Sequence, residues 1–164
     1  MQTGVIEQIG KPQSIYTRPY NVFVSTFIGH SNLFVGKIKV EDHKTLVLFQ
    51  DSYQLEMDNL GVVTDGQEVI ISVRPEEFSV QEDGIQCTIH NRVFLGKYVN
   101  YTLAFAPGMV IKNQSATEFS QDLGHAEKAF EIGETIILRS NKAKINIFTA
   151  DQKMNLIRDV KQYE

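Results

Sequence analysis

The chain contains one cysteine, Cys87, among 164 residues, and it has no long apolar run. A single thiol cannot form an internal disulfide, and its scarcity is typical of proteins from a reducing compartment. No stretch approaches the roughly 20 apolar residues of a membrane-spanning helix, and we expect no signal peptide before the first structural element. The composition, with 42% hydrophobic and 22% charged residues, favours a compact intracellular chain with one ordinary core or two small ones.

Positive charge is also scarce. The 16 Lys and Arg residues are outnumbered by 20 Asp and Glu residues, which gives a net charge of −4. A protein that binds nucleic acid needs a basic surface to neutralise phosphates, and no basic cluster interrupts this balance. We therefore expect no nucleic-acid partner, and we assign the ten Phe and six Tyr residues to the core and to subunit contacts.

Motifs for nucleotide chemistry are missing. A phosphate-binding loop needs the pattern Gly-x-x-x-x-Gly-Lys-Ser/Thr, because bare backbone N–H groups and one Lys surround the phosphates. The three Gly-Lys pairs of the chain lack both the earlier Gly and the following hydroxyl residue; they are Gly10-Lys11, Gly36-Lys37 and Gly96-Lys97. We expect no cofactor site in this chain.

Other catalytic patterns are missing as well. The four histidines are scattered without a pair at positions i and i+4, and no second Cys joins them, so a zinc site is not expected. No Ser stands in a Gly-x-Ser-x-Gly elbow. We expect no catalytic residues and no metal ligands; the histidines are His30, His43, His90 and His125.

The hydrophobic pattern divides the chain into a helical start and a β-rich remainder. Residues 12–28 have helical spacing, with Pro12 suited to a first turn and Gly29 to a stop. Beyond Asn32 the pattern becomes that of strands separated by turn-rich segments. The expected strands cover residues 33–40, 46–49, 69–73, 85–90, 98–105, 135–138 and 145–148.

A weak internal repeat runs through the β-rich part. The segment Phe34-Val35-Gly36-Lys37 recurs as Phe94-Leu95-Gly96-Lys97, and the segment Gly66–Ile71 has a counterpart in Gly133–Ile137. Such short matches also arise by chance in β proteins, so two interpretations stay open. One is coincidence, and the other is two related β units of roughly 60 residues that share one architecture.

A polar insert occupies Lys112 to Lys128 in the second half. It is rich in Asn, Gln, Ser and Thr, which predicts either a long loop or a mobile flap. With the neighbouring Gly108, Asn113 and Ser115, it offers N–H and hydroxyl groups that suit an anion, although a solvated loop is the simpler explanation.

Two segments resemble a known family. The stretch Gly4–Asn32 is similar to the last strand, two short helices and hinge of the ATP-binding subunits of ATP-binding-cassette (ABC) importers that carry a C-terminal extension. Ser25 departs from that pattern, in which Ala is usual. The run Val73-Arg74-Pro75-Glu76 resembles the [IV]-R-P-E of the extension itself, the transport-associated oligonucleotide/oligosaccharide-binding-like (TOBE) domain. The first block matches at Gly4, Ile6, Gln8, Gly10, Pro12, Ile15, Tyr16, Pro19, Phe23, Val24, Phe27, Ile28, Gly29 and Asn32.

The resemblance implies a mainly β fold of two OB-like barrel units in series after a short N-terminal strand and a helical lead-in. Residues 1–30 are then the end of an ATPase domain with a hinge at Gly29, residues 31–82 the first unit and residues 83–164 the second. ATP and magnesium are expected in an ATPase domain upstream and not in this chain. Arg74, Pro75, Glu76 and Asn32 are structural or interface candidates, because an Arg–carboxylate pair at a strand end pins a turn or meets a partner.

The resemblance also implies a function. Such extensions associate across a two-fold axis and tether two ATPase subunits during solute uptake, so the expected partners are a second copy, the chain's own ATPase domain and membrane permease subunits. The expected location is the inner face of the cell membrane, and polyamines or ferric iron are the expected kind of solute. The alternative is a sensor of a small ligand, such as an oxyanion, or of a partner protein.

Overall fold

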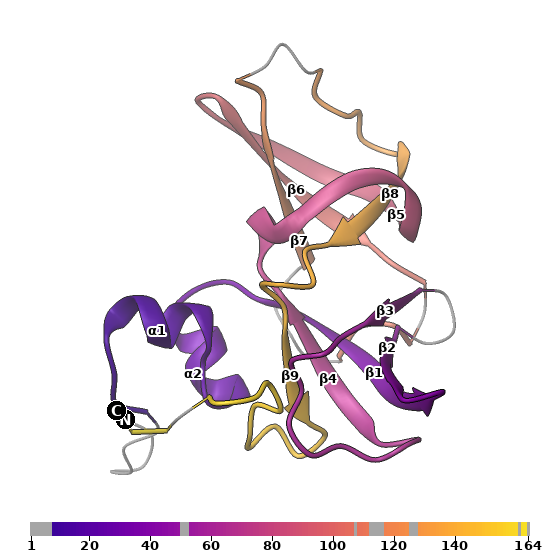
Figure 1. The fold of residues 1–164 in the computed structure, drawn as a ribbon. Helices are drawn as coiled ribbons and strands as arrows, with labels where there is room; N and C mark the ends of the chain where they lie inside the picture. The colour runs from indigo at the N-terminus through magenta and orange to yellow at the C-terminus, as the bar shows by residue number, and fades with distance from the viewer. Residues whose placement is uncertain are drawn as a thin grey trace.

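The computed structural model describes residues 8–49, 53–106, 108–111, 117–124, 128–160 and 162–163. Two short helices are followed by strands that form two curled antiparallel sheets (Figure 1). The predicted mainly β class with a helical lead-in is confirmed. The predicted N-terminal strand at residues 4–7 lies outside the described residues.

The lead-in consists of α1, Pro12–Thr17, and α2, Val22–Phe27. Pro12 occupies the first turn of α1, where its missing N–H costs nothing. Asn21 caps α2, because its Oδ1 accepts a hydrogen bond from the Val24 N–H at 3.0 Å. The helices lie beside the sheet that contains β4 and β9 (Figure 1). Both fall within residues 12–28, the region predicted to be helical.

The first sheet has the strand order β3-β2-β1-β4-β9. Its hairpin between β1 and β2 turns through Asp42 and His43, whose φ angles of 50° and 64° give a two-residue turn that matches the twist of the strands without using glycine. The strands are β1, Asn32–Glu41; β2, Lys44–Leu48; β3, Gln54–Glu56; β4, Glu68–Val73; and β9, Asn146–Thr149.

The second sheet has the order β7-β6-β5-β8. A single 3-10 turn, η1 (Pro75–Glu77), connects β4 with this sheet, and Gly96 at φ 67° closes the hairpin between β5 and β6. The strands are β5, Phe78–Leu95; β6, Tyr98–Ala104; β7, Thr117–Asp122; and β8, Thr135–Ser140.

The internal repeat has a structural counterpart in the turns before β4 and β8. Gly66 and Gly133 both have positive φ, at 82° and 90°. The Gly66 N–H donates to the Ile38 carbonyl of β1 and the Gly133 N–H to the Ile89 carbonyl of β5, each at 2.7 Å. The strand order agrees with this equivalence, because β3-β2-β1-β4 in the first sheet corresponds to β7-β6-β5-β8 in the second.

The other half of the repeat is wrong. Gly36 lies within β1, where an added Cβ would stand 2.4 Å from Ile71 Cδ1, whereas Gly96 lies in a hairpin turn with open space around it. The two glycines serve different needs, close packing in one case and a left-handed turn in the other. The match between Phe34–Lys37 and Phe94–Lys97 is therefore a coincidence of composition.

The two sheets are joined by strands that cross between them. β9 follows β8 in the chain but pairs with β4, while the start of β5 follows β4 but pairs with β8. Leu138 of β8 is opposite both Val80 and Ile85, so β5 bends around β8. Gly84 lies inside this bend, and a Cβ there would be only 2.2 Å from the Leu138 carbonyl oxygen.

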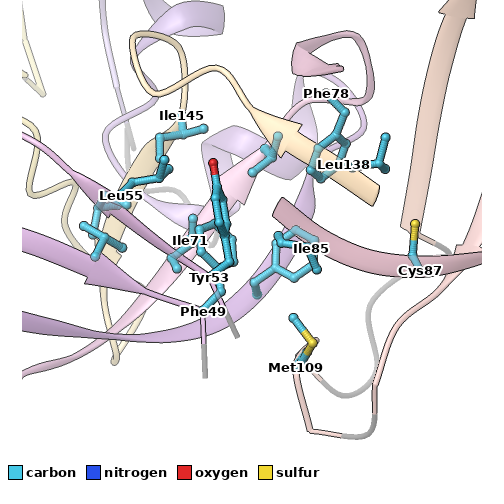
Figure 2. Close-up of a cluster of buried hydrophobic side chains, with 14 of the residues drawn as sticks. Phe49, Tyr53, Leu55, Ile71, Phe78, Ile85, Cys87, Met109, Leu138 and Ile145 are labelled. Carbon is cyan, nitrogen blue, oxygen red and sulfur yellow. The ribbon is translucent and has the colours of Figure 1, made fainter. Parts of the chain in front are cut away.

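The larger buried cluster is shared by both sheets as a result of this exchange, while a smaller one packs Val22 of α2 against β1, β4 and β9. Side chains of the first sheet, such as Ile71, point toward Ile85 and Leu138 of the second sheet (Figure 2). Figure 2 also shows Phe49 and Phe78 in the same cluster. The predicted boundaries at residues 30 and 82 remain a prediction about domains, but strand pairing and packing both cross the second boundary.

The predicted polar insert at 112–128 needs correction. Residues Thr117–Asp122 form β7, an edge strand paired with β6, and so they are not part of a loop or flap. Thr117 and Gln121 are buried although polar, because the Thr117 hydroxyl donates to the Leu103 carbonyl and Gln121 accepts from the Tyr101 hydroxyl. Residues 112–116 and 125–127 lie outside the described residues.

Candidate functional site

Arg74 connects the lead-in to the end of β4. Its side chain is buried, and its Nη1 donates to the carbonyls of Ser25 at 2.9 Å and His30 at 3.0 Å. Its Nη2 donates to the Tyr16 carbonyl at 3.3 Å, and the guanidinium lies 4.4 Å from the Tyr16 ring centroid. Burial lowers the pKa of Arg74, but hydrogen bonds and ring contact stabilise its charge.

Tyr16 and Glu76 extend this connection. The Tyr16 hydroxyl donates to Glu76 Oε1, and Pro75, which starts η1, is itself buried. Burial and the bond to Glu76 raise the pKa of Tyr16 to about 12, so the phenol remains a donor across the neutral range. We call Tyr16, Gly29, Arg74 and Glu76 the lead-in clamp.

Gly29 lies at the centre of the clamp. A Cβ at this position would stand 3.3 Å from Tyr16 Cε2 and 3.4 Å from Arg74 Nη1. Arg74 also holds carbonyls on both sides of Gly29, at Ser25 and His30. The hinge at Gly29 stays a prediction; motion there would have to break these bonds or carry Arg74 along.

Asn32 joins the two sheets. Its side-chain amide makes two hydrogen bonds to the backbone of Glu118, as a neighbouring strand would. Nδ2 donates to the Glu118 carbonyl and Oδ1 accepts from the Glu118 N–H, both at 2.7 Å. His30 Nε2 lies 3.4 Å from Glu118 Oε2 and 3.3 Å from Asn32 Oδ1. Asn32 is fully buried, so replacement of its amide leaves the Glu118 backbone without these partners.

A second set of polar contacts holds the lead-in to β9. Arg18 donates to the carbonyls of Ile145 and Ala143 at 2.8 and 2.7 Å and to Asn146 Oδ1 at 3.0 Å. Asn155 Nδ2 donates to the Pro19 carbonyl at 2.8 Å. The lead-in and the β body are therefore one packed unit in this conformation.

The residues predicted from the sequence thus fall in two groups where the lead-in meets the strands, a region that we call the joint. Gly29, Arg74, Pro75 and Glu76 meet in the lead-in clamp, and Asn32 lies next to it at the contact between the sheets. Arg74 donates its hydrogen bonds to backbone carbonyls, while the Glu76 carboxylate accepts a hydrogen bond from the Tyr16 hydroxyl. Interface roles for these residues stay a prediction.

Sequence reasoning missed two participants of the joint, Arg18 and Glu118. Tyr16 is marked by the family pattern, but nothing in the helical block indicates that Arg18 reaches back to the strands. Glu118 takes part mainly through its backbone, which no residue pattern reports.

A groove lies between α1 and the C-terminal residues. Its two arginines already donate to backbone carbonyls, Arg18 to Ile145 and Ala143, and Arg158 to Asp58 and Leu60. This leaves the groove poorly suited to an anion. Among the described residues, no group of three or more His, Cys, Asp or Glu side chains is placed to hold a metal ion.

The candidate anion site at Gly108, Asn113 and Ser115 cannot be located, because Asn113 and Ser115 lie outside the described residues. No helix in the described part of the chain has the length and apolar character needed to cross a membrane.

The fold and the joint define an OB-like β module of two antiparallel sheets, and the helical lead-in is tied to both of them. Comparison with known families gives the particular class: residues 71–148 match the TOBE domain, and the chain therefore contains a TOBE domain.

The curated relatives are ATP-binding subunits of importers. The chain is 30% identical over 164 residues to the Fe(3+) ions import ATP-binding protein FbpC of Fusobacterium nucleatum, covering 98% of this chain and 41% of that protein. It is 34% identical over 122 residues to the spermidine/putrescine import ATP-binding protein PotA of Trichodesmium erythraeum, covering 66% of this chain and 32% of that protein. The chain thus spans about two fifths or less of these relatives.

Proposed function

We propose that this chain is the C-terminal regulatory region of an ABC importer ATP-binding subunit, and that it tethers two such subunits across a two-fold axis. The observation that carries the proposal is the TOBE match at 71–148 together with alignment over nearly the whole chain to an importer ATP-binding protein. The region itself is non-catalytic, and ATP and magnesium belong to the ATPase domain of the longer subunit.

The physical basis of tethering is effective concentration. A lasting contact between regulatory regions makes closure of the two ATPase domains intramolecular, which raises its probability without new contacts at the catalytic surface. The packed joint suits this role, because Arg74 and Arg18 fix the lead-in to the β body. A rigid connection transmits the position of the tether to the domain that precedes it.

The partners follow from this role. They are a second copy of the subunit, its own ATPase domain and, through that domain, permease subunits at the inner face of the cell membrane. The named relatives import Fe(3+) ions and spermidine or putrescine, and we propose a solute of one of these kinds.

The test is the ATPase activity of the longer subunit, measured during serial dilution with and without residues 31–164, so that the predicted end of the ATPase domain at residues 1–30 stays in place. Tethering predicts that specific activity stays constant on dilution when the region is present and falls when it is removed. Equal dilution curves for the two proteins would contradict a tethering role.

A further inference from the structure

The hairpin between β5 and β6 carries an unusual concentration of exposed apolar side chains. Val93, Leu95 and Tyr98 are 52%, 57% and 42% exposed, although the strands that carry them are well paired. In Figure 1 the far end of this hairpin extends away from α1 and α2. Apolar side chains gathered on one small surface are typical of a protein contact.

The strand register places these side chains on one face. Leu95 is opposite Tyr98 and Val93 is opposite Asn100, and side chains directly opposite in an antiparallel pair point to the same side. Val99 and its opposite residue Phe94 point to the other side, where Val99 is fully buried in the core and Phe94 is 57% exposed. Val93, Leu95 and Tyr98 therefore form a patch on the outer face of the second sheet, which we call the hairpin patch.

The hairpin patch is bordered by charges of both signs. Asp122 of β7 is opposite Tyr98 on the same face, and it is exposed. Lys97 in the turn is exposed too, and its Nζ lies 5.3 Å from the Tyr98 ring centroid. A surface with an apolar centre, one cation and one anion can complement itself, as a two-fold contact requires.

We propose that the hairpin patch is the contact between two copies of this chain. A two-fold axis parallel to β6 stacks the two outer faces, buries Leu95 and Tyr98 between them and brings Lys97 toward Asp122 of the partner subunit. This assignment rests on the tethering function, for which it supplies the surface. The second copy fits better than a lipid surface, because Asp122 beside the apolar centre would repel anionic headgroups.

The first experiment compares dimer dissociation constants by sedimentation equilibrium for three proteins: the wild-type chain, Leu95→Asp and Val62→Asp. Val62 is 94% exposed in the segment between β3 and β4, so its variant adds the same charge outside the patch. We expect Leu95→Asp to weaken the dimer at least about tenfold, because a carboxylate would be desolvated at the centre of the contact. Val62→Asp should leave the dissociation constant unchanged.

The outcomes separate the surface from the function. A wild-type dimer that Leu95→Asp does not weaken, or that both variants weaken equally, overturns the hairpin patch and leaves tethering in place. A wild-type chain that remains monomeric throughout overturns both. Far-UV circular dichroism establishes that each variant is folded, which we expect because both side chains are largely exposed.

A charge exchange tests the arrangement of the two copies. Lys97→Asp alone and Asp122→Lys alone each place like charges together across the axis, so both should weaken the dimer. The double variant restores opposite charges and should recover most of the lost affinity. Absence of recovery in a folded double variant would contradict the proposed axis, and the measurement is the same sedimentation series.

Discussion

At the scale of single residues, Arg74 has the clearest structural role. Arg74→Ala leaves the carbonyls of Tyr16, Ser25 and His30 without their donor at a buried site. We expect a loss of about 2 to 4 kcal/mol in the free energy of unfolding. The measurement is urea-induced unfolding followed by circular dichroism.

Arg158→Ala is the matched control for this variant. Arg158 also donates to two backbone carbonyls, those of Asp58 and Leu60, but its side chain is exposed to water. Water can replace its hydrogen bonds, so we expect a loss of about 1 kcal/mol or less. Equal losses for the two variants would show that Arg74 does not hold the lead-in.

Cys87 predicts a specific dependence of stability on alkaline pH. Burial raises the pKa of its thiol to about 12 from an ordinary value of 9.0. Between these values the unfolded chain loses the thiol proton while the folded chain keeps it, so stability falls as pH rises. The slope from this group is about 1.4 kcal/mol per pH unit above pH 9.

Cys87→Ala provides the comparison for that slope. The variant is less stable at neutral pH because it leaves a small cavity, but it lacks the ionising thiol. We expect the difference in unfolding free energy between the two proteins to be constant below pH 8 and to shrink above pH 9. A difference that does not change up to pH 11 would contradict a buried neutral thiol.

At the scale of elements, the two equivalent turns allow a paired prediction. Gly66→Ala and Gly133→Ala each force an L side chain into a left-handed conformation, and neither added Cβ meets an atom within 4 Å. Only backbone strain then contributes, so we expect nearly equal losses of about 1 to 2 kcal/mol. Thermal unfolding of both variants measures this; losses that differ by more than twofold would show that the turns are not equivalent.

The strands show what a sequence pattern can reveal. The predicted strands at 33–40, 69–73 and 135–138 are present, because aliphatic and β-branched residues there alternate with polar ones or run into the core. β7 was missed because its inward positions are Thr117, Phe119 and Gln121, only one of which is apolar. Their period of two was the available signal, but the polar composition concealed it.

The joint was predictable only in part. The Arg-Pro-Glu run and Gly29 marked positions that meet in the structure, since both belong to segments with a family pattern. The partners that hold them are mostly backbone carbonyls, such as those of Ser25 and His30, and these have no signature in the sequence. The exchange of β9 and the start of β5 between sheets also depends on long-range pairing, which local periodicity does not encode.

At the scale of the whole molecule, the shared core predicts cooperative unfolding. Val47 of β2 and Leu138 of β8 are both fully buried in one cluster. Leu138→Ala should cost about 2 to 5 kcal/mol and Val47→Ala somewhat less. Each should lower the hydrogen-exchange protection of slow amides in β1 and β6 alike, because the sheets open together. Protection lost in only one sheet would show two independent units.

The central claim is that this region holds two subunits together, and the most direct measurement is its mass in solution. Light scattering across a concentration series from micromolar upward, at two salt concentrations, gives that mass without labels. The account predicts a dimer, twice the 18.6 kDa of the chain, that persists on dilution and depends only modestly on salt, because apolar burial dominates the contact. A monomer at every concentration and both salts would contradict it.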